Sequence, residues 1–116
     1  MFTFLYSDPK SVIRLKATNG TRFADFREIV YVESDRYHII VHLSDESKLT
    51  MTGTLKNMMR KLGEKMFYQV HRKYIANVGY VKEIVDEPSG KYIILKTTDK
   101  IDVSGDRLPG LYRYFR

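Results

Sequence analysis

Residues 67–77 read Phe-Tyr-Gln-Val-His-Arg-Lys-Tyr-Ile-Ala-Asn. Two short runs rich in aromatic and β-branched side chains, Tyr68–Val70 and Tyr74–Ala76, flank the triplet His71-Arg72-Lys73. Such runs are typical of β-strands, and a short polar interval between them is typical of a turn. The stretch therefore predicts a basic turn that is anchored by a strand at each end.

The side chains of this turn can donate hydrogen bonds to phosphates or to the edges of bases. Arg72 can form two parallel hydrogen bonds to guanine in the major groove, and Lys73 can hold a phosphate as a point charge. His71 adds a third donor beside them. The alternative is a surface turn that is basic by chance, and composition alone does not decide between the two.

The net charge of the chain is concentrated around this turn. The whole sequence carries +6, with a pI near 9.5. Seven Lys or Arg and one Glu lie between Leu55 and Lys82, whereas thirteen basic residues balance thirteen acidic residues elsewhere. A neutral scaffold with one basic segment fits a phosphate-binding surface. A solvated helix face followed by a turn is the alternative.

A short amphipathic helix is expected just before the hairpin. Apolar side chains in Leu55–Leu62 recur at i, i+3, i+4 and i+7, the spacing of one helical face. Thr52 or Thr54 can cap its start, and Gly63 can end it in the left-handed conformation. We interpret the methionines of this face as core filler rather than as a groove for a partner.

Alternating runs that predict strands precede the helix. Asn19-Gly20 favours a tight hairpin turn, because it accepts positive φ angles. Asp35-Arg36 is expected to be the turn of a second hairpin. In the run that follows it, Tyr37 shares a face with Ile39, Val41 and Leu43, so we expect Tyr37 in the core. The predicted strands are Val12–Ala17, 21–26, 29–34, 37–43 and Lys48–Thr52.

Three more strands and a terminal helix are expected after the hairpin. The strands are 80–85, 92–97 and 100–103, and the helix has apolar residues at Leu108, Leu111, Tyr112 and Phe115. Pro109 belongs in the first turn of a helix, which favours Asp106 over Ser104 as its cap. With about nine short strands, two short helices and no repeat or linker, residues 1–116 are predicted to form one mainly β domain.

Composition excludes several classes of protein. A chain of 116 residues, 43% of them hydrophobic, suits one domain with its own core. The absence of cysteine excludes disulfides, thiol catalysis and cysteine-ligated metals. No apolar run approaches the ~20 residues that cross a bilayer, and Met1–Tyr6 lacks the features of a secretion signal. We therefore expect a cytoplasmic protein without membrane insertion.

The residues also argue against a metal site and against catalysis. His38 and His42 lie four residues apart on a predicted strand, about 13 Å, which is too far for both to bind one zinc ion. His71 has no carboxylate at ligand spacing. The sequence has no nucleophile elbow and no glycine-rich phosphate loop. We expect no metal, no cofactor and no enzymatic activity.

From Asp25 to Phe115 the sequence resembles the LytTR DNA-binding domain of bacterial transcription and response regulators. The resemblance rests on residues 26–34, on a helix opened by Gly53-Thr54-Leu55 and closed by Leu62-Gly63, on the pattern His-x-x-Tyr-Ile-x-Asn in 67–77, on strands 81–85 and 92–95, and on Val103-Ser104. It implies an elongated fold of several antiparallel sheets. Such domains bind promoter DNA as pairs on direct repeats, with loops rather than a helix in successive major grooves.

The resemblance also implies which residues read bases. The turn before the predicted strand 37–43 supplies the first site, here Arg36 and Tyr37. The residue after His71 supplies the second, here Arg72. Tyr74 and Asn77 are interpreted as structural rather than base-reading.

The third implied site lies just after Val103-Ser104, where the family usually has an arginine. This sequence has Gly105 there, followed by Asp106. Either Arg107 reaches across, or the third contact is lost.

The implied partners are double-stranded promoter DNA, a second copy of the chain on the adjacent repeat, and a receiver or membrane domain that family members usually carry before this module. These partners are the ones expected of a bacterial response regulator in a two-component system. One alternative is a protein-interaction module that uses strand edges or the aromatic tail 112–115. Another is single-stranded RNA binding through Tyr37, Tyr68 and Tyr74, which the predicted core position of Tyr37 disfavours.

Overall fold

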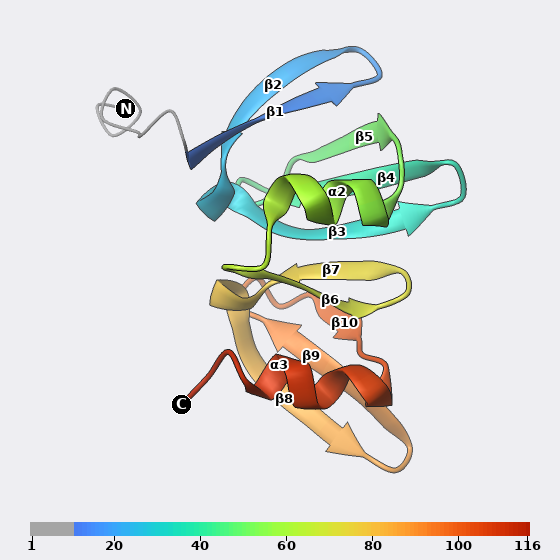
Figure 1. Ribbon diagram of the computed structural model, residues 1–116, viewed down its shortest axis with the longest axis vertical. Helices are drawn as coiled ribbons and strands as arrows, with labels where there is room; N and C mark the ends of the chain where they lie inside the picture. The colour runs from blue at the N-terminus through green and yellow to red at the C-terminus, as the bar shows by residue number, and fades with distance from the viewer. Residues whose placement is uncertain (1–10) are drawn as a thin grey trace.

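The computed structural model describes residues 11–116, which form an elongated stack of three antiparallel sheets (Figure 1). Its extents are 45 × 33 × 23 Å, and its radius of gyration of 14.3 Å exceeds the ~13 Å of a compact domain of about 100 residues. A two-stranded hairpin, β1-β2, lies at one end of the stack, a five-stranded sheet of order β5-β4-β3-β7-β6 in the middle, and a three-stranded sheet of order β10-β9-β8 at the other end.

The strands are β1 (Val12–Ala17), β2 (Gly20–Asp25), β3 (Ile29–Asp35), β4 (His38–Leu43), β5 (Lys48–Thr52), β6 (Phe67–His71), β7 (Tyr74–Asn77), β8 (Val81–Glu87), β9 (Gly90–Leu95) and β10 (Lys100–Asp102). The helices are α2 (Leu55–Leu62) and α3 (Leu108–Tyr112), with 3-10 turns η2 (Phe26–Glu28), η3 (Val78–Tyr80) and η4 (Gly105–Arg107). The predicted mainly β fold with two short helices is confirmed. Neither helix is long and apolar enough to cross a bilayer, and residues 11–116 contain no other candidate span.

The central sheet separates two hydrophobic cores, because strand β3 is buried on both faces. Ile29 and Val32 enter the first core, together with residues of α2 and the β1-β2 hairpin. Val30 and Tyr31 enter the second, together with residues of the three-stranded sheet and α3. A bulge between Ile29 and Tyr31 interrupts the alternation, so two consecutive side chains face the second core.

Helix α2 follows the prediction from apolar spacing. Thr54, the second of the two predicted caps, accepts a hydrogen bond from the backbone N–H of Asn57 at 3.2 Å. Gly63 ends the helix with φ +74°, a conformation that favours glycine. Met58 is buried in the first core, so its interpretation as core filler is confirmed.

The predicted position of Tyr37 in the core is wrong. The turn consists of Arg36 and Tyr37, one residue later than predicted, and β4 begins at His38. Tyr37 is 85% exposed. The alternation that correctly buries Ile39 and Val41 does not extend to Tyr37, because this residue lies beyond the last cross-strand pair, Asp35–His38.

The predicted cap of the terminal helix is also wrong. Arg107, not Asp106, holds the N-cap position of α3, and no side chain caps it. The physical reason is η4, a 3-10 turn that runs directly into α3 and leaves no extended residue between them. Pro109 lies in the first turn, as predicted. The helix ends at Tyr112, which is 48% exposed, so Phe115, predicted to belong to it, lies beyond its end and is 41% exposed.

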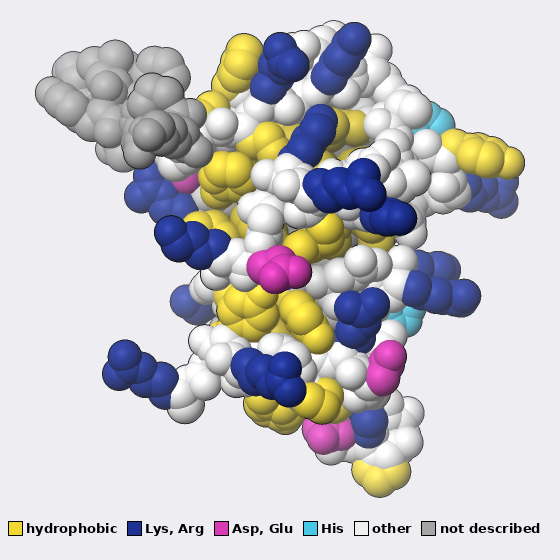
Figure 2. Space-filling view, viewed as in Figure 1, with side chains coloured by type: hydrophobic (Ala, Val, Ile, Leu, Met, Phe, Trp, Pro, Cys, Tyr) yellow, Lys and Arg dark blue, Asp and Glu magenta, His cyan; other side chains and the backbone are white. Residues whose placement is uncertain are grey.

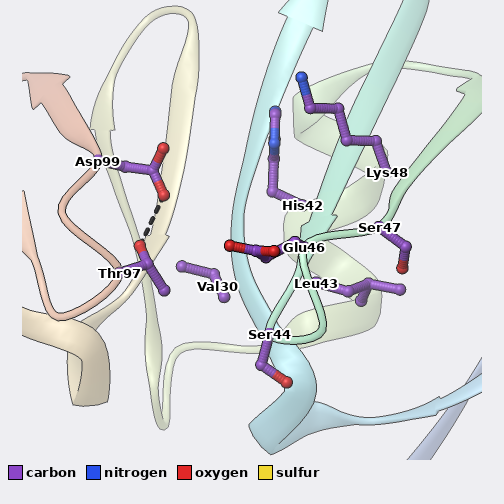
Figure 3. Close-up of a pocket in the computed structure, with 9 residues that line it drawn as sticks. All are labelled: Val30, His42, Leu43, Ser44, Glu46, Ser47, Lys48, Thr97 and Asp99. Carbon is purple, nitrogen blue, oxygen red and sulfur yellow. Dashed lines mark hydrogen bonds between the residues drawn. The ribbon is translucent and has the colours of Figure 1, made fainter.

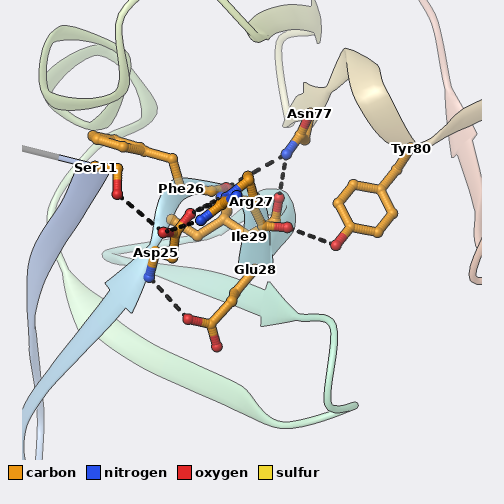
Figure 4. Close-up of polar contacts among 8 residues, drawn as sticks. All are labelled: Ser11, Asp25, Phe26, Arg27, Glu28, Ile29, Asn77 and Tyr80. Carbon is orange, nitrogen blue, oxygen red and sulfur yellow. Dashed lines mark hydrogen bonds and ion pairs between the residues drawn. The ribbon is translucent and has the colours of Figure 1, made fainter. Parts of the chain in front are cut away.

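A polar joint connects the start of β3 with the end of β7 (Figure 4). Asn77 is 3% exposed, and its Nδ2 donates to the carbonyl oxygen of Ile29 at 2.8 Å. Its Oδ1 accepts from the backbone N–H of Gly79 at 2.9 Å. The hydroxyl of Tyr80 donates to the Arg27 carbonyl oxygen at 2.6 Å. Turns η2 and η3 are thereby held against each other where the chain passes between the two cores.

Asp25 organises the η2 side of this joint. Its carboxylate accepts from the backbone N–H of Arg27 and from the guanidinium of the same residue, at 2.9 to 3.0 Å, and Glu28 bonds back to its N–H. The hydrogen bonds from Arg27 hold the pKa of the Asp25 carboxyl well below its usual range, against the opposing effect of burial. The result is a capping box that fixes how the hairpin enters β3.

Replacing Asn77 by alanine should lower the free energy of unfolding by about 2 kcal/mol, because the buried carbonyl of Ile29 loses its donor. Tyr80→Phe removes a hydrogen bond at an exposed site of the same joint and should cost about 0.5 to 1 kcal/mol. Urea denaturation of both variants measures the difference, and equal losses would contradict a special role for Asn77.

Candidate nucleic-acid interface

Three segments predicted to read bases open on one edge of the molecule, on the right in Figure 1. They are the turn 36–37 between β3 and β4, the turn 72–73 between β6 and β7, and η4 after β10. Strand β3 pairs antiparallel with both β4 and β7, so the turns at the end of β3 and at the start of β7 must lie at the same edge. We call these three segments the loop edge.

Backbone hydrogen bonds connect the three segments. The N–H of Ser34 donates to the carbonyl oxygen of Lys73 at 2.9 Å, which extends the β3-β7 ladder as far as the second turn. The N–H of Ser104 donates to the carbonyl oxygen of Val70 at 2.9 Å. The β6-β7 hairpin is therefore bonded to both of the other segments.

The turn of the β6-β7 hairpin is shaped by a bulge. The register passes from the pair Gln69–Ile75 to the pair His71–Tyr74, which leaves Val70 without a partner in the ladder. Val70 is fully buried, and its carbonyl oxygen is the acceptor for Ser104. The extra residue thus supplies the attachment point for the third segment.

His71 orders the turn from within. Its Nδ1 accepts a hydrogen bond from the backbone N–H of Lys73 at 3.1 Å. A neutral ring in this arrangement carries its proton on Nε2, which remains available as a donor. Arg72 and Lys73 are exposed, and within residues 11–116 their side chains form no hydrogen bond or ion pair.

The first turn holds an arginine in an unfavourable conformation. Arg36 has φ +57°, a region in which an ordinary residue costs about 1 to 2 kcal/mol. Both Arg36 and Tyr37 are exposed. Strained residues persist where the surrounding structure determines them, and they concentrate at functional sites.

The third segment has no arginine at the position that the resemblance implies. Gly105 and Asp106 are exposed there, and Arg107 follows at the end of η4. The carbonyl oxygen of Arg107 accepts a hydrogen bond from the hydroxyl of Tyr68 at 2.9 Å. The guanidinium of Arg107 is exposed and has no ion-pair partner in the part of the chain described.

A series of contacts between aromatic rings leads from the loop edge into the central sheet. Tyr74 packs near Tyr31 and near His71, with ring centroids 6.4 and 5.6 Å apart. Tyr31 in turn stacks on His42 at 3.9 Å, and His42 Nε2 lies 2.6 Å from Glu33 Oε1. Burial, followed by the negative charge of Glu33, raises the pKa of the Tyr74 hydroxyl above its ordinary value.

All seven basic residues of the predicted segment are exposed, but they do not form one compact patch. Arg72 and Lys73 lie on the loop edge, whereas others lie on α2, on the face shown in Figure 2. Arg14 and Lys16 of β1 extend that face, and with Thr21 and Lys61 they line a hollow of ≈ 350 Å³. Arg14 and Lys16 were not predicted to belong to a basic surface, although alternation along β1 places both on its outer side.

Another hollow, of ≈ 320 Å³, lies at the opposite ends of the strands, between the turns β4-β5 and β9-β10 (Figure 3). Its lining mixes an apolar floor with groups of both charges: Val30, His42, Leu43, Ser44, Glu46, Ser47, Lys48, Thr97 and Asp99. Within residues 11–116, no three His, Asp or Glu side chains converge as metal ligands. None of the residues predicted to read bases lines this hollow.

The three tyrosines considered for RNA stacking do not share an open face. Tyr68 of β6 packs against Tyr114 at 5.7 Å, and Tyr74 of β7 packs near Tyr31. Tyr37 lies in the turn between β3 and β4. The premise that Tyr37 is in the core is wrong, but the half-buried rings of Tyr68 and Tyr74 still argue against a stacking platform.

Comparisons with known proteins agree on one family. The family model described as the LytTr DNA-binding domain matches residues 19–116. The chain is 35% identical over 81 residues to the sensory transduction protein LytT of Bacillus subtilis, covering 69% of this chain and 33% of that protein. It is 27% identical over 88 residues to an uncharacterized response regulatory protein of Vibrio cholerae, covering 72% and 34%.

A solved structure matches over nearly the whole chain. It is the LytTr DNA-binding domain of a methyl-accepting/DNA response regulator from Bacillus cereus, with a TM-score of 0.76 and 25% identity. The match covers 90% of this chain and 95% of that one. In contrast, the chain spans about a third of the length of the curated relatives.

Arg36→Asn should leave the free energy of unfolding unchanged or raise it by up to about 1 kcal/mol, because asparagine tolerates positive φ better than arginine does. The matched control is Lys73→Asn, in a turn without positive φ, where no gain is expected. Urea denaturation measures both. A loss of more than about 1 kcal/mol in Arg36→Asn would mean that the arginine side chain stabilises the fold.

Proposed function

The chain belongs to the family of LytTr DNA-binding domains, and from this premise we propose that its loop edge reads the sequence of double-stranded promoter DNA. The observation that carries the proposal is the presence of three exposed arginines without ion-pair partners among the described residues, one on each segment of the loop edge. Transcription regulation follows from membership of the family.

Each segment has a proposed role. Arg36 and Tyr37 enter one major groove, and Arg72 forms a bidentate contact with guanine in the next. Lys73 holds a phosphate, and the Nε2–H of His71 is a further donor at the same turn.

Ser104 and Arg107 form the third contact. Arg107 takes the role of the arginine that the resemblance implies at position 105, where this chain has glycine. Short turns that are hydrogen-bonded to one another lose little conformational freedom on binding, which favours recognition by loops.

We propose that two copies bind two same-direction motifs separated by about one helical turn, so that both lie on the same face of the duplex. The relatives include a sensory transduction protein and a response regulatory protein, each about three times as long as its matched region. A receiver domain elsewhere in such a protein is the proposed source of the input signal, and the cytoplasm the proposed location.

A protein-docking function is the second candidate. The observation that favours it is the partial exposure of Tyr112 and Phe115, which line a hollow of ≈ 390 Å³ together with Val81 and Ile84. Salt separates the two candidates. With ~4 to 6 phosphate contacts, DNA affinity should fall with a log-log slope near −4 to −5, whereas an apolar interface is nearly insensitive to salt.

Selection from a random duplex library at physiological salt tests the proposal directly. Two enriched short motifs in the same direction would support reading by paired copies. Retention of DNA without any enriched motif would contradict sequence-specific reading and leave phosphate binding alone.

Arg72→Ala should cost about 1 to 3 kcal/mol on the selected site and little on random DNA, because only the cognate base pair loses a contact. Lys73→Ala, one residue away in the same turn, is the matched control and should weaken both duplexes alike. Fluorescence anisotropy titrations measure all four affinities. An equal loss on both duplexes for Arg72→Ala would contradict its base-reading role.

A further inference from the structure

Helix α3 contains a glycine that its backbone does not require. Gly110 has no positive φ, and glycine within a helix costs about 1 kcal/mol relative to alanine. A Cβ at this position would clash with the hydroxyl oxygen of Tyr68 and would lie 2.8 Å from its Cζ. Of the seven glycines in the chain, Gly110 is the one where an added Cβ would meet an atom closer than 3.0 Å. The missing side chain makes room for Tyr68.

The space at Gly110 lets the Tyr68 hydroxyl reach the third segment of the loop edge. From β6, this hydroxyl donates to the carbonyl oxygen of Arg107 at 2.9 Å. Its ring packs against that of Tyr114, at a centroid distance of 5.7 Å. Tyr68 is half-buried and packs against the second core next to α3.

Strand β6 therefore holds the third segment at both of its ends. Val70 accepts from the N–H of Ser104 where the segment begins, and Tyr68 donates to the carbonyl of Arg107 where it ends. Strand β6 ends at His71, and the turn that carries Arg72 follows directly. The second and third segments of the loop edge are thus fixed to one strand.

We propose that Tyr68 and Gly110 are positioning residues that set the direction of Arg107, so that this arginine serves as the third base-reading residue although Gly105 occupies the usual position. The inference rests on the proposed function and adds the element that orients its third contact. The Tyr68 hydroxyl acts through the backbone of Arg107 and touches no base itself.

The test is a double-mutant cycle of Tyr68→Phe and Arg107→Ala on the selected duplex and on a duplex altered at the third contact. The ratio of the two affinities is the readout, because a change in the folded fraction affects both duplexes equally. Arg107→Ala should lower this ratio about 5- to 160-fold, the range of one good base contact. Tyr68→Phe should lower it by a large part of that factor, and the double variant should be no worse than Arg107→Ala.

Tyr114→Phe is the matched control, because it removes a hydroxyl of the same ring pair that donates to the carbonyl of Glu64 at 2.6 Å, away from the loop edge. It should leave the ratio unchanged. Gly110→Ala displaces Tyr68 by a second route and should reproduce the effect of Tyr68→Phe.

Additive losses in the cycle would overturn the inference, and so would a ratio within about twofold of the wild-type value in Tyr68→Phe. If Arg107→Ala leaves the ratio unchanged, the inference also fails. In each case an intact effect of Arg72→Ala shows that sequence reading itself survives. Loss of discrimination at the Arg72 position as well would show that the proposed function has failed.

Discussion

The burial of β3 on both faces is the constraint on which the rest of the structure depends. Its four consecutive residues Ile29–Val32 are buried, and both edges of the strand are paired, one with β4 and one with β7. A strand in this position cannot shift its register without moving apolar side chains from one core to the other. The turns at the ends of its neighbours are therefore fixed relative to each other, which is how a domain with short helices can present rigid loops.

Local pattern predicted the elements well where a single period holds. The spacing of Leu55–Leu62 predicted α2, with its start left open between two caps. Asn19-Gly20 predicted the first hairpin, but its two-residue turn is Thr18-Asn19, one residue earlier than predicted, and Asn19 does not have a positive φ angle. The predictions from sequence pattern were wrong at positions where the periodic pattern of an element ends. Tyr37 continues the alternation of β4 by sequence, but pairing ends at His38, and the geometry of the turn places its side chain in solvent. Asp106 fits a capping position only if α3 starts without the preceding η4.

The candidate site could be predicted as a set of residues but not as an arrangement. His71, Arg72 and Lys73 stand out by charge between two strand-like runs, and the family resemblance added Arg36, Tyr37 and the segment after Val103. The link between these segments depends on the bulge at Val70, and no local signal in Gln69-Val70-His71 marks a bulge. The bond from Ser104 to Val70 spans 34 positions of the sequence, so it follows from the packing of the whole fold.

The same bulge also determines how the third segment of the loop edge is attached. Because Val70 has no ladder partner, its carbonyl oxygen is free to accept from Ser104, and the start of the third segment is fixed by backbone atoms alone. Any residue except proline at position 104 can supply that N–H. The side chains at 105 to 107 are exposed and can change without loss of core packing. A segment that is held through its backbone and exposes its side chains can therefore change those side chains while the fold is retained.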